Sequence, residues 1–194
     1  IAGNTGTTAA STMTVDTVVS AVDLSATGGT QATATVTVNS TEATAGKSIA
    51  GDIQAPSDTD IASVSIVVGG AGVDLANDTL TLDSGTDRAL NADFSGDNLT
   101  VGGISGVDFS YVAASKTLTL TADAGGALTA ADIDNIVAGI LFKTSSTTQG
   151  DRTFTVSYTD IAGNTGTTAA STMTVDTVAP GAVDLSATGG TQAT

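Results

Sequence analysis

The chain has 194 residues and a formal net charge of −15 at pH 7, with 5 basic residues against 20 acidic ones. Phosphate groups would be repelled by such an acidic surface, so we expect no nucleic-acid partner and no direct membrane contact. The sequence contains no Cys and no His, which excludes disulfide bonds and the usual zinc sites.

Short runs in which apolar and polar residues alternate are the main structural signal along the chain. Successive side chains of a strand point to opposite faces, so this alternation predicts half-buried β-strands. The gaps between the runs are rich in Gly, Asp, Asn and Ser, as turns require. The predicted strands are, in order, 34–38, 63–68, 79–83, 98–104, 107–112, 116–122, 152–158 and 171–176. Strands at this spacing predict an all-β antiparallel sandwich.

One segment near residue 130 breaks the alternation. Apolar residues recur there at helical spacing, at Ile133, Ile136, Val137, Ile140 and Leu141. Thr129 is a suitable N-cap, and Asp132 follows in the first turn, where the helix dipole favours a negative charge. We therefore predict one short helix over about 130–140, packed on the edge of the sandwich.

Two segments of the chain occur twice. Residues 1–18 are identical to residues 161–178, and residues 21–33 recur as residues 182–194. Identity over this length indicates a recent tandem duplication, so we expect a parent protein with many such units.

The phase of the duplication predicts the division of the chain. We expect one complete sandwich repeat over 21–177, with linkers at 19–20 and 178–181. Residues 1–18 would be the last strand of the preceding repeat, and residues 182–194 the first strand of the following one. Unpaired strand edges seek partners, so these two fragments would give a head-to-tail contact between neighbouring molecules.

Asp-rich turns are the candidates for a binding function. Only one acidic residue, Glu42, is not Asp, and the short Asp carboxylate suits rigid loops that hold Ca²⁺. Ca²⁺ takes roughly six to eight oxygen ligands, which turns converging at one end of a sandwich could supply. The candidate ligands are Asp58, Asp60, Asp160, Asn164, Asp176 and its copy Asp16, with Asp52 and Asp23 as secondary candidates. For each of them, a turn cap without any metal is the open alternative.

Enzymatic activity is not expected. Without His or Cys, the usual pairs of a nucleophile and a base are missing. Paired carboxylates could hydrolyse glycosides, but sugar sites usually present exposed aromatic side chains. The chain has two Tyr, four Phe and no Trp, which is few for such a site.

Threonine alternates with other residues at 79–81, 117–121 and 153–155. A flat array of these threonines could bind ice, whereas the ordinary alternative is the solvent face of β-strands. No short period ties the runs together, so we favour the ordinary alternative.

Several segments carry a family resemblance. They read AVDLSATGG from residue 21, DTDIASVSI from residue 58, ALTAADIDNIVAGILF from residue 127, and YTDIAGN followed by TVDTVAP towards residue 180. The chain resembles the cadherin-like or bacterial Ig-like repeats of giant RTX adhesins, which Gram-negative bacteria export by type I secretion. The first junction departs from the pattern, since it reads TVVS where the second reads TVAP.

The resemblance implies a structural extender repeat at the extracellular surface of a Gram-negative bacterium. Neighbouring repeats of the same chain would be its partners, and Ca²⁺ would stiffen the fibre that holds a distal adhesive region away from the cell. Asp160 and Asn164 would match the family's D-x-AGN turn. Asp176 would match its exit-linker Asp, and residues 58–60 its D-x-D loop. A glycan-binding or ice-binding module of the same kind of adhesin is the alternative function.

Overall fold

The structure is a computed structural model, and it describes residues 33–50, 60–83, 85–166 and 169–178. The candidate ligands Asp16, Asp23, Asp52 and Asp58 lie outside the described residues, as do both terminal fragments. The linker at 19–20 also lies outside the described residues, and of the second linker, 178–181, the structure describes Val178 alone.

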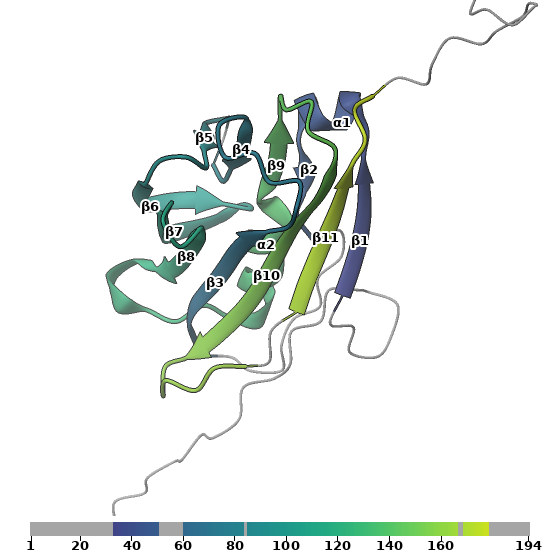
Figure 1. Cartoon of the computed structure of the whole chain (residues 1–194). Coiled ribbons are helices and arrows are strands. Elements are labelled where there is room, and N and C mark those ends of the chain that lie inside the picture. Colours follow the sequence, from purple (N-terminus) through teal and green to yellow (C-terminus); the bar gives the residue numbers. More distant parts are fainter. Residues whose placement is uncertain (1–32, 51–59, 84, 167–168, 179–194) are drawn as a thin grey trace, which may run out of the picture.

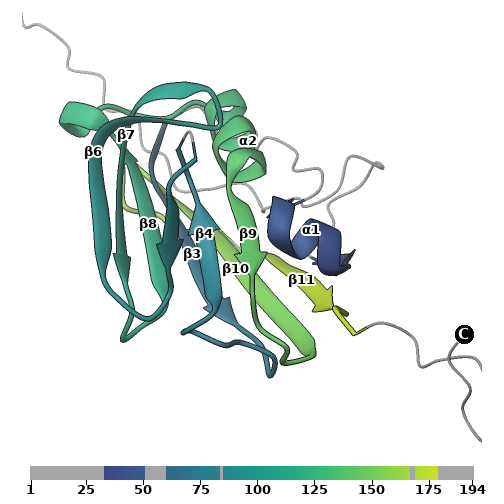
Figure 2. The same cartoon turned by 90° about the horizontal axis from the view of Figure 1, so that it is seen from above.

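Two β-sheets form the body of the protein, which confirms the predicted all-β sandwich (Figures 1 and 2). In spatial order, the seven-stranded sheet contains β1 (Thr33–Val38), β11 (Ala169–Val175), β10 (Gly150–Asp160), β3 (Ile61–Gly69), β8 (Thr117–Ala122), β7 (Ile104–Val112) and β6 (Phe94–Val101). The four-stranded sheet contains β2 (Lys47–Ser48), β9 (Leu141–Thr144), β4 (Asp78–Thr81) and β5 (Asp87–Ala89).

One strand pair departs from the predicted antiparallel arrangement. β1 and β11 run parallel, in register from Thr33 opposite Ala170 to Val38 opposite Val175. Parallel neighbours need a long connection, and here the whole described body of the sandwich lies between them. As a consequence, β1 begins at one end of the sandwich and β11 finishes at the other (Figure 1). We call these ends the N-terminal pole and the C-terminal pole.

The predicted helix is present as α2 (Ala130–Gly139), and its cap is the predicted one. The Thr129 side chain accepts from the backbone nitrogen of Asp132, and the Asp132 carboxylate accepts from the backbone nitrogen of Thr129. The last part of the predicted stripe is not helical, because Ile140 is extended and Leu141 begins β9.

Two other short helices were not predicted. They are α1 (Ser40–Ala45), which Asn39 and Glu42 cap in the same reciprocal way, and the 3₁₀ turn η1 (Asp123–Gly125). Neither is long enough to show an apolar period of 3.6 residues. Figure 2 shows α1 and α2 on the side of the four-stranded sheet.

The run 98–104 is a hairpin and not the single strand that its alternation predicts. β6 ends at Val101, β7 begins at Ile104, and the two residues between them form the turn. Gly102 and Gly103 both have positive φ, at 58° and 84°, which two-residue hairpin turns require. The glycine pair was therefore the turn signal within the run.

A buried ion pair connects the two sheets. Asp78 of β4 and Arg152 of β10 have fully buried side chains, and Arg152 Nε donates to Asp78 Oδ2 at 3.3 Å. Beside this pair, the rings of Phe142 and Phe154 meet edge to face across the sheets at 5.7 Å. The core therefore contains one polar tie between its layers that the sequence analysis did not foresee.

Candidate metal centre

Three of the predicted ligands meet at the N-terminal pole. β3 runs antiparallel to β10, which brings the start of β3 beside Asp160 at the end of β10. The backbone nitrogen of Ile161 donates to the carbonyl oxygen of Asp60 at 3.0 Å, so the predicted turns around Asp60 and Asp160 are neighbours. Asn164 completes the turn that follows Asp160.

The carboxylate of Asp160 closes its own turn. It is 2% exposed, and it accepts from both the backbone nitrogen and the side-chain amide of Asn164, each at 2.8 Å. The side-chain hydrogen bond from Asn164 and the backbone amides of the turn hold the pKa of Asp160 below its ordinary value. For Asp160 and Asn164 the structure thus shows the turn-capping role, and a cation there would have to share these oxygens.

Asp176 lies at the opposite pole. Val175 pairs with Gly150 at the start of β10, whereas Asp160 is the last of the 11 residues of that strand. At about 3.3 Å per residue, the two carboxylates are separated by roughly 35 Å along the sheet. Within a single unit, Asp176 therefore does not converge with the turns around Asp60 and Asp160.

The exposed carboxylate of Asp176 is held near the end of β11. Its backbone nitrogen donates to the carbonyl oxygen of Val38 at 3.0 Å, and its Oδ1 accepts from the backbone nitrogen of Val178 at 3.3 Å. This turn orients the side chain at the point where the chain leaves the sheet.

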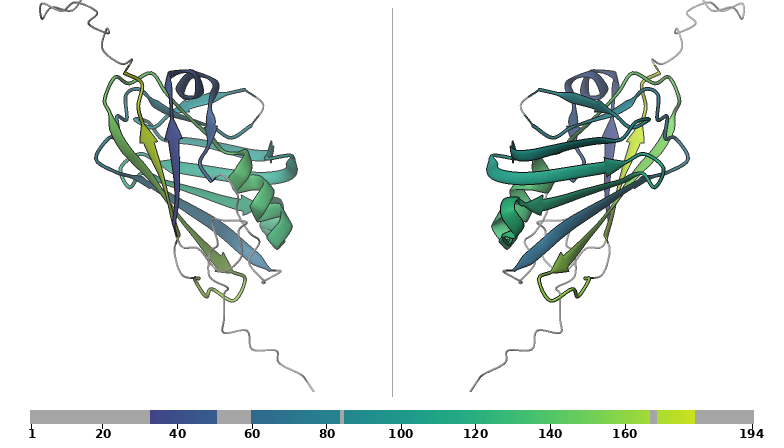
Figure 3. Two further views of the ribbon diagram at one scale, coloured as in Figure 1. Left: turned by 90° about the vertical axis from the view of Figure 1, so that its right-hand side faces the viewer. Right: turned by 90° about the vertical axis from the view of Figure 1, so that its left-hand side faces the viewer.

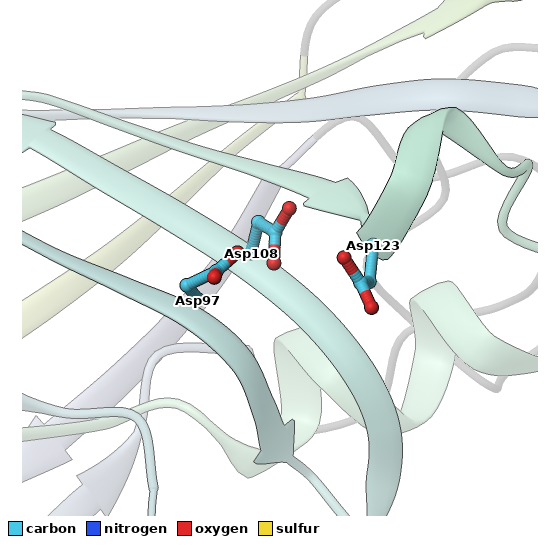
Figure 4. A group of neighbouring side chains, drawn as sticks. All are labelled: Asp97, Asp108 and Asp123. Atoms are coloured by element: carbon cyan, nitrogen blue, oxygen red, sulfur yellow. The ribbon is translucent and has the colours of Figure 1, made fainter.

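Three carboxylates that the sequence analysis missed gather at the other edge of the large sheet. Within the described residues, Asp97 of β6, Asp108 of β7 and Asp123 of η1 are the one group of acidic side chains with oxygens all within 4.8 Å of one another (Figure 4). Asp97 is exposed, and the other two are half-buried. Oxygen donors in this arrangement attract hard divalent cations and otherwise repel one another.

The carboxyl group of Asp108 raises the pKa of Asp97. The hydrogen bond that Asp97 shares with the carboxyl group of Asp108, and then the charge of Asp108, raise the pKa of Asp97 above its ordinary value. Asp108 itself accepts from the backbone nitrogen of Asn98 at 2.7 Å, which fixes its carboxylate beside Asp97. The register of β6 shifts between Gly96 and Leu99, and no local sequence pattern announces where such a shift places a side chain.

Replacing Asp97 by Asn should raise the free energy of unfolding at pH 7 in buffer that contains EDTA. A carboxyl group with a raised pKa in the folded state disfavours folding once it ionises. The penalty therefore grows as the pH rises from the ordinary value of an Asp through the raised pKa of Asp97, and it is absent in acid. Urea unfolding of both proteins at pH 3 and pH 7 should show the gain only at pH 7.

Asp87→Asn is the matched control for that experiment. A hydrogen bond from Lys143 lowers the pKa of Asp87, so this carboxylate stabilises the fold above the ordinary pKa of an Asp. The control should lose stability at pH 7 and change little in acid. A loss with Asp97→Asn similar to that with Asp87→Asn would contradict net repulsion between Asp97 and Asp108.

The Thr-x-Thr runs of β8 and β10 share the outer face of the large sheet with serines of β3. Ser65 lies opposite Ser157 of β10 and Thr119 of β8, in one row across the three strands. The sheet twists strongly, and β6 to β8 run at a steep angle to β1 and β11 (Figure 3). A twisted surface does not offer the flat array of threonines that ice binding requires. We therefore interpret these threonines as the solvent-facing side chains of ordinary β-strands.

No protein-family model matches the chain, and no curated protein matches it. The resemblance to adhesin repeats therefore stays a prediction. None of the helices in the described part of the chain has the length and apolarity to cross a membrane.

Proposed function

We propose that the chain is a structural extender repeat of a large bacterial surface adhesin, without catalytic activity of its own. In this proposal, Ca²⁺ rigidifies the junctions between repeats, and the array holds a distal adhesive region away from the cell. Both the extracellular location and the export by type I secretion are part of the same proposal.

The path of the chain through the sandwich is the observation that carries the proposal. β1 begins at the N-terminal pole and β11 ends at the C-terminal pole. Residues 1–18 repeat residues 161–178, so a copy of the segment that ends this unit also precedes it. A unit that is entered at one pole and left at the other can be joined end to end without the chain folding back, and a row of such units extends linearly.

The acidic residues at the poles support a role for Ca²⁺ at the junctions. In an end-to-end array, Asp176 of one unit would face the pole that carries Asp60 and Asp160 of the next unit. Carboxylates that face one another repel, and a divalent cation between them would convert the repulsion into a bond. The donors at both poles are oxygens, which suit Ca²⁺ and not zinc. Metal affinity would then add to folding stability and to stiffness.

Millimolar Ca²⁺ should raise the melting temperature of the chain, and EDTA should reverse the change. At a free concentration about a hundredfold above Kd, binding to the folded state alone adds about 2.7 kcal/mol. For a domain of this size this corresponds to a rise of about 5–10 °C. The melt is followed by circular dichroism, with Mg²⁺ at the same concentration as the control for unspecific screening.

Variants locate the stabilising ions. Asp60→Asn and Asp176→Asn should each reduce the rise in melting temperature that Ca²⁺ causes. The same measurement on Asp97→Asn tests whether Ca²⁺ also binds to the three carboxylates at the other edge of the large sheet. Identical melting curves with Ca²⁺ and with EDTA would remove the calcium part of the proposal.

A two-unit chain tests the extended arrangement directly. Residues 182–194 already repeat residues 21–33, so adding residues 34–178 after Thr194 completes a second unit. Small-angle scattering in Ca²⁺ should give a maximum dimension of about twice that of one unit, and a broader distance distribution in EDTA. A folded-back pair with nearly the dimension of one unit would overturn the extender function.

A further inference from the structure

Three Asn residues of the chain stand in the sequence pattern that accepts N-linked sugars. The pattern is Asn, any residue except Pro, then Ser or Thr. It occurs at Asn39-Ser40-Thr41, Asn77-Asp78-Thr79 and Asn98-Leu99-Thr100. Because the chain is rich in Ser and Thr, composition alone produces such triplets, and the structure must decide which of them presents a reactive amide.

The first two triplets use their Asn side chains to hold the fold. Asn39 caps α1, where its Oδ1 accepts from the backbone nitrogens of Thr41 and Glu42, both at 3.0 Å. Asn77 donates from Nδ2 to Asp74 at 2.9 Å and accepts from the hydroxyl of Ser145 at 3.3 Å. In both triplets these contacts hold the side chain against the fold, so its amide is not free to turn towards a transferase.

The third triplet presents its amide freely. Asn98 is exposed at the register shift of β6, with a φ of 50°, and its backbone nitrogen donates to Asp108. No hydrogen bond among the described residues engages its side chain. Thr100, which completes the triplet, is exposed as well. β6 is the edge strand of the large sheet, and no further strand of the described residues covers this position.

There is also room for a sugar beside Asn98. An open hollow of about 620 Å³ lies between the end of β6, Leu82 and the last turn of α2, and Asn98, Leu99 and Thr100 form part of its wall. The side chain therefore stands at the rim of a depression and not on a crowded surface.

We propose that Asn98 is an acceptor site for N-linked glycosylation. The donor is a sugar activated by a diphosphate, and a separate transferase catalyses the step. Asn98 Nδ2 forms a bond to the anomeric carbon while the bond from that carbon to the diphosphate oxygen breaks. The diphosphate leaves with the electron pair, and one amide proton passes to a base of the transferase.

A sugar at this position would cover an open sheet edge. Exposed edge strands pair with other chains, and near-identical tandem units are prone to misassembly with one another. Modification of Asn98 would block such pairing along β6. This consequence rests on the proposed tandem array, whereas the modification itself does not.

Mass spectrometry of the protein isolated from the cells that produce it tests the proposal. We expect the peptide containing Asn98 to carry the added mass of a sugar and the peptides containing Asn39 and Asn77 to be unmodified. A single hexose would identify a nucleotide-activated donor, and a preassembled oligosaccharide a lipid-linked one. An unmodified Asn98 would overturn the proposal. Equal modification of all three Asn residues would contradict the inference that the fold makes Asn98 the preferred acceptor.

Variants of Thr100 provide the matched control. Thr100→Ala should abolish the modification, and Thr100→Ser should retain it. The Thr100 hydroxyl is exposed and its one described contact is with the Ser105 hydroxyl at 3.3 Å, so both variants should fold. Modification that persists in Thr100→Ala at the level of the unaltered protein would contradict recognition of this triplet.

Discussion

Replacing Arg152 by Met should lower the free energy of unfolding by about 3–5 kcal/mol. The side chains of Arg152 and Asp78 are both fully buried, and the guanidinium reaches both carboxylate oxygens, at 3.3 and 3.4 Å. Methionine fills a similar volume, but it leaves the charge of Asp78 buried without a counter-charge. Urea unfolding measures the loss, with an unchanged slope to confirm that only stability has changed.

The loss should be large because each partner of the pair is also held by further hydrogen bonds around it. Asp78 also accepts from the hydroxyl of Thr144 at 2.6 Å and from the backbone nitrogen of Asp74 at 2.9 Å. Arg152 Nη1 donates to the carbonyl oxygens of Thr148 and Gly150, at 2.9 and 3.0 Å. Without Arg152, these two partly buried carbonyl groups lose a donor.

Arg88→Met is the matched control. Arg88 pairs with Asp83 at 2.8 Å and lies over the ring of Phe109 at 4.8 Å, but its side chain is partly exposed. Water can replace part of what it loses, so the expected loss is about 1 kcal/mol. The double variant Asp78→Asn with Arg152→Met should recover part of the loss, because the uncompensated charge is gone. Equal losses in the two single variants would contradict the special role of the buried pair.

The sequence of β10 contains a signal for this pair. Side chains at Arg152, Phe154, Val156 and Tyr158 alternate inward along β10, and all four are buried. A basic residue on the buried face of a predicted strand requires a carboxylate partner. Which carboxylate it is cannot be derived locally, because Asp78 lies 74 residues away in the other sheet.

Strands and the cap of α2 were predictable because their signals are local. Alternation over five or more residues marks one buried face, and Thr129 with Asp132 marks a helix start. β2 and β5 have only 2 and 3 residues, which is too short for a period. β9 was also hidden, since Ile140 and Leu141 continue the helical stripe by chance.

The candidate site was only partly predictable. Asp60 and Asp160 lie close together because β3 and β10 are neighbouring strands. The distance of Asp176 from them depends on the direction of β11, which the local sequence does not give. Asp97, Asp108 and Asp123 come from three separate elements, and a register shift in β6 sets their approach. A non-local arrangement of this kind is fixed by the complete sheet and not by any one segment.

Gly102→Ala should lower the free energy of unfolding by about 3 kcal/mol. The turn between β6 and β7 packs backbone to backbone against α2, so that a Cβ on Gly102 would overlap the carbonyl oxygen of Asn135. Gly139 of α2 meets Gly102 in the same close contact. The backbone of α2 cannot rotate away from the added methyl group as a side chain could. In Gly102→Ala, α2 must therefore shift away from the sheet. Urea unfolding and amide hydrogen exchange along α2 measure the effect.

Gly103→Ala separates this contact from the cost of the turn itself. Gly103 has a φ of 84°, but a Cβ there would meet nothing within 4 Å. The control therefore loses only the conformational freedom that glycine provides, about 1–2 kcal/mol, and the exchange of the α2 amides should stay slow. Only Gly102→Ala should accelerate that exchange. If both variants lost the same stability with α2 equally protected, the turn would not be what holds the helix on the sandwich.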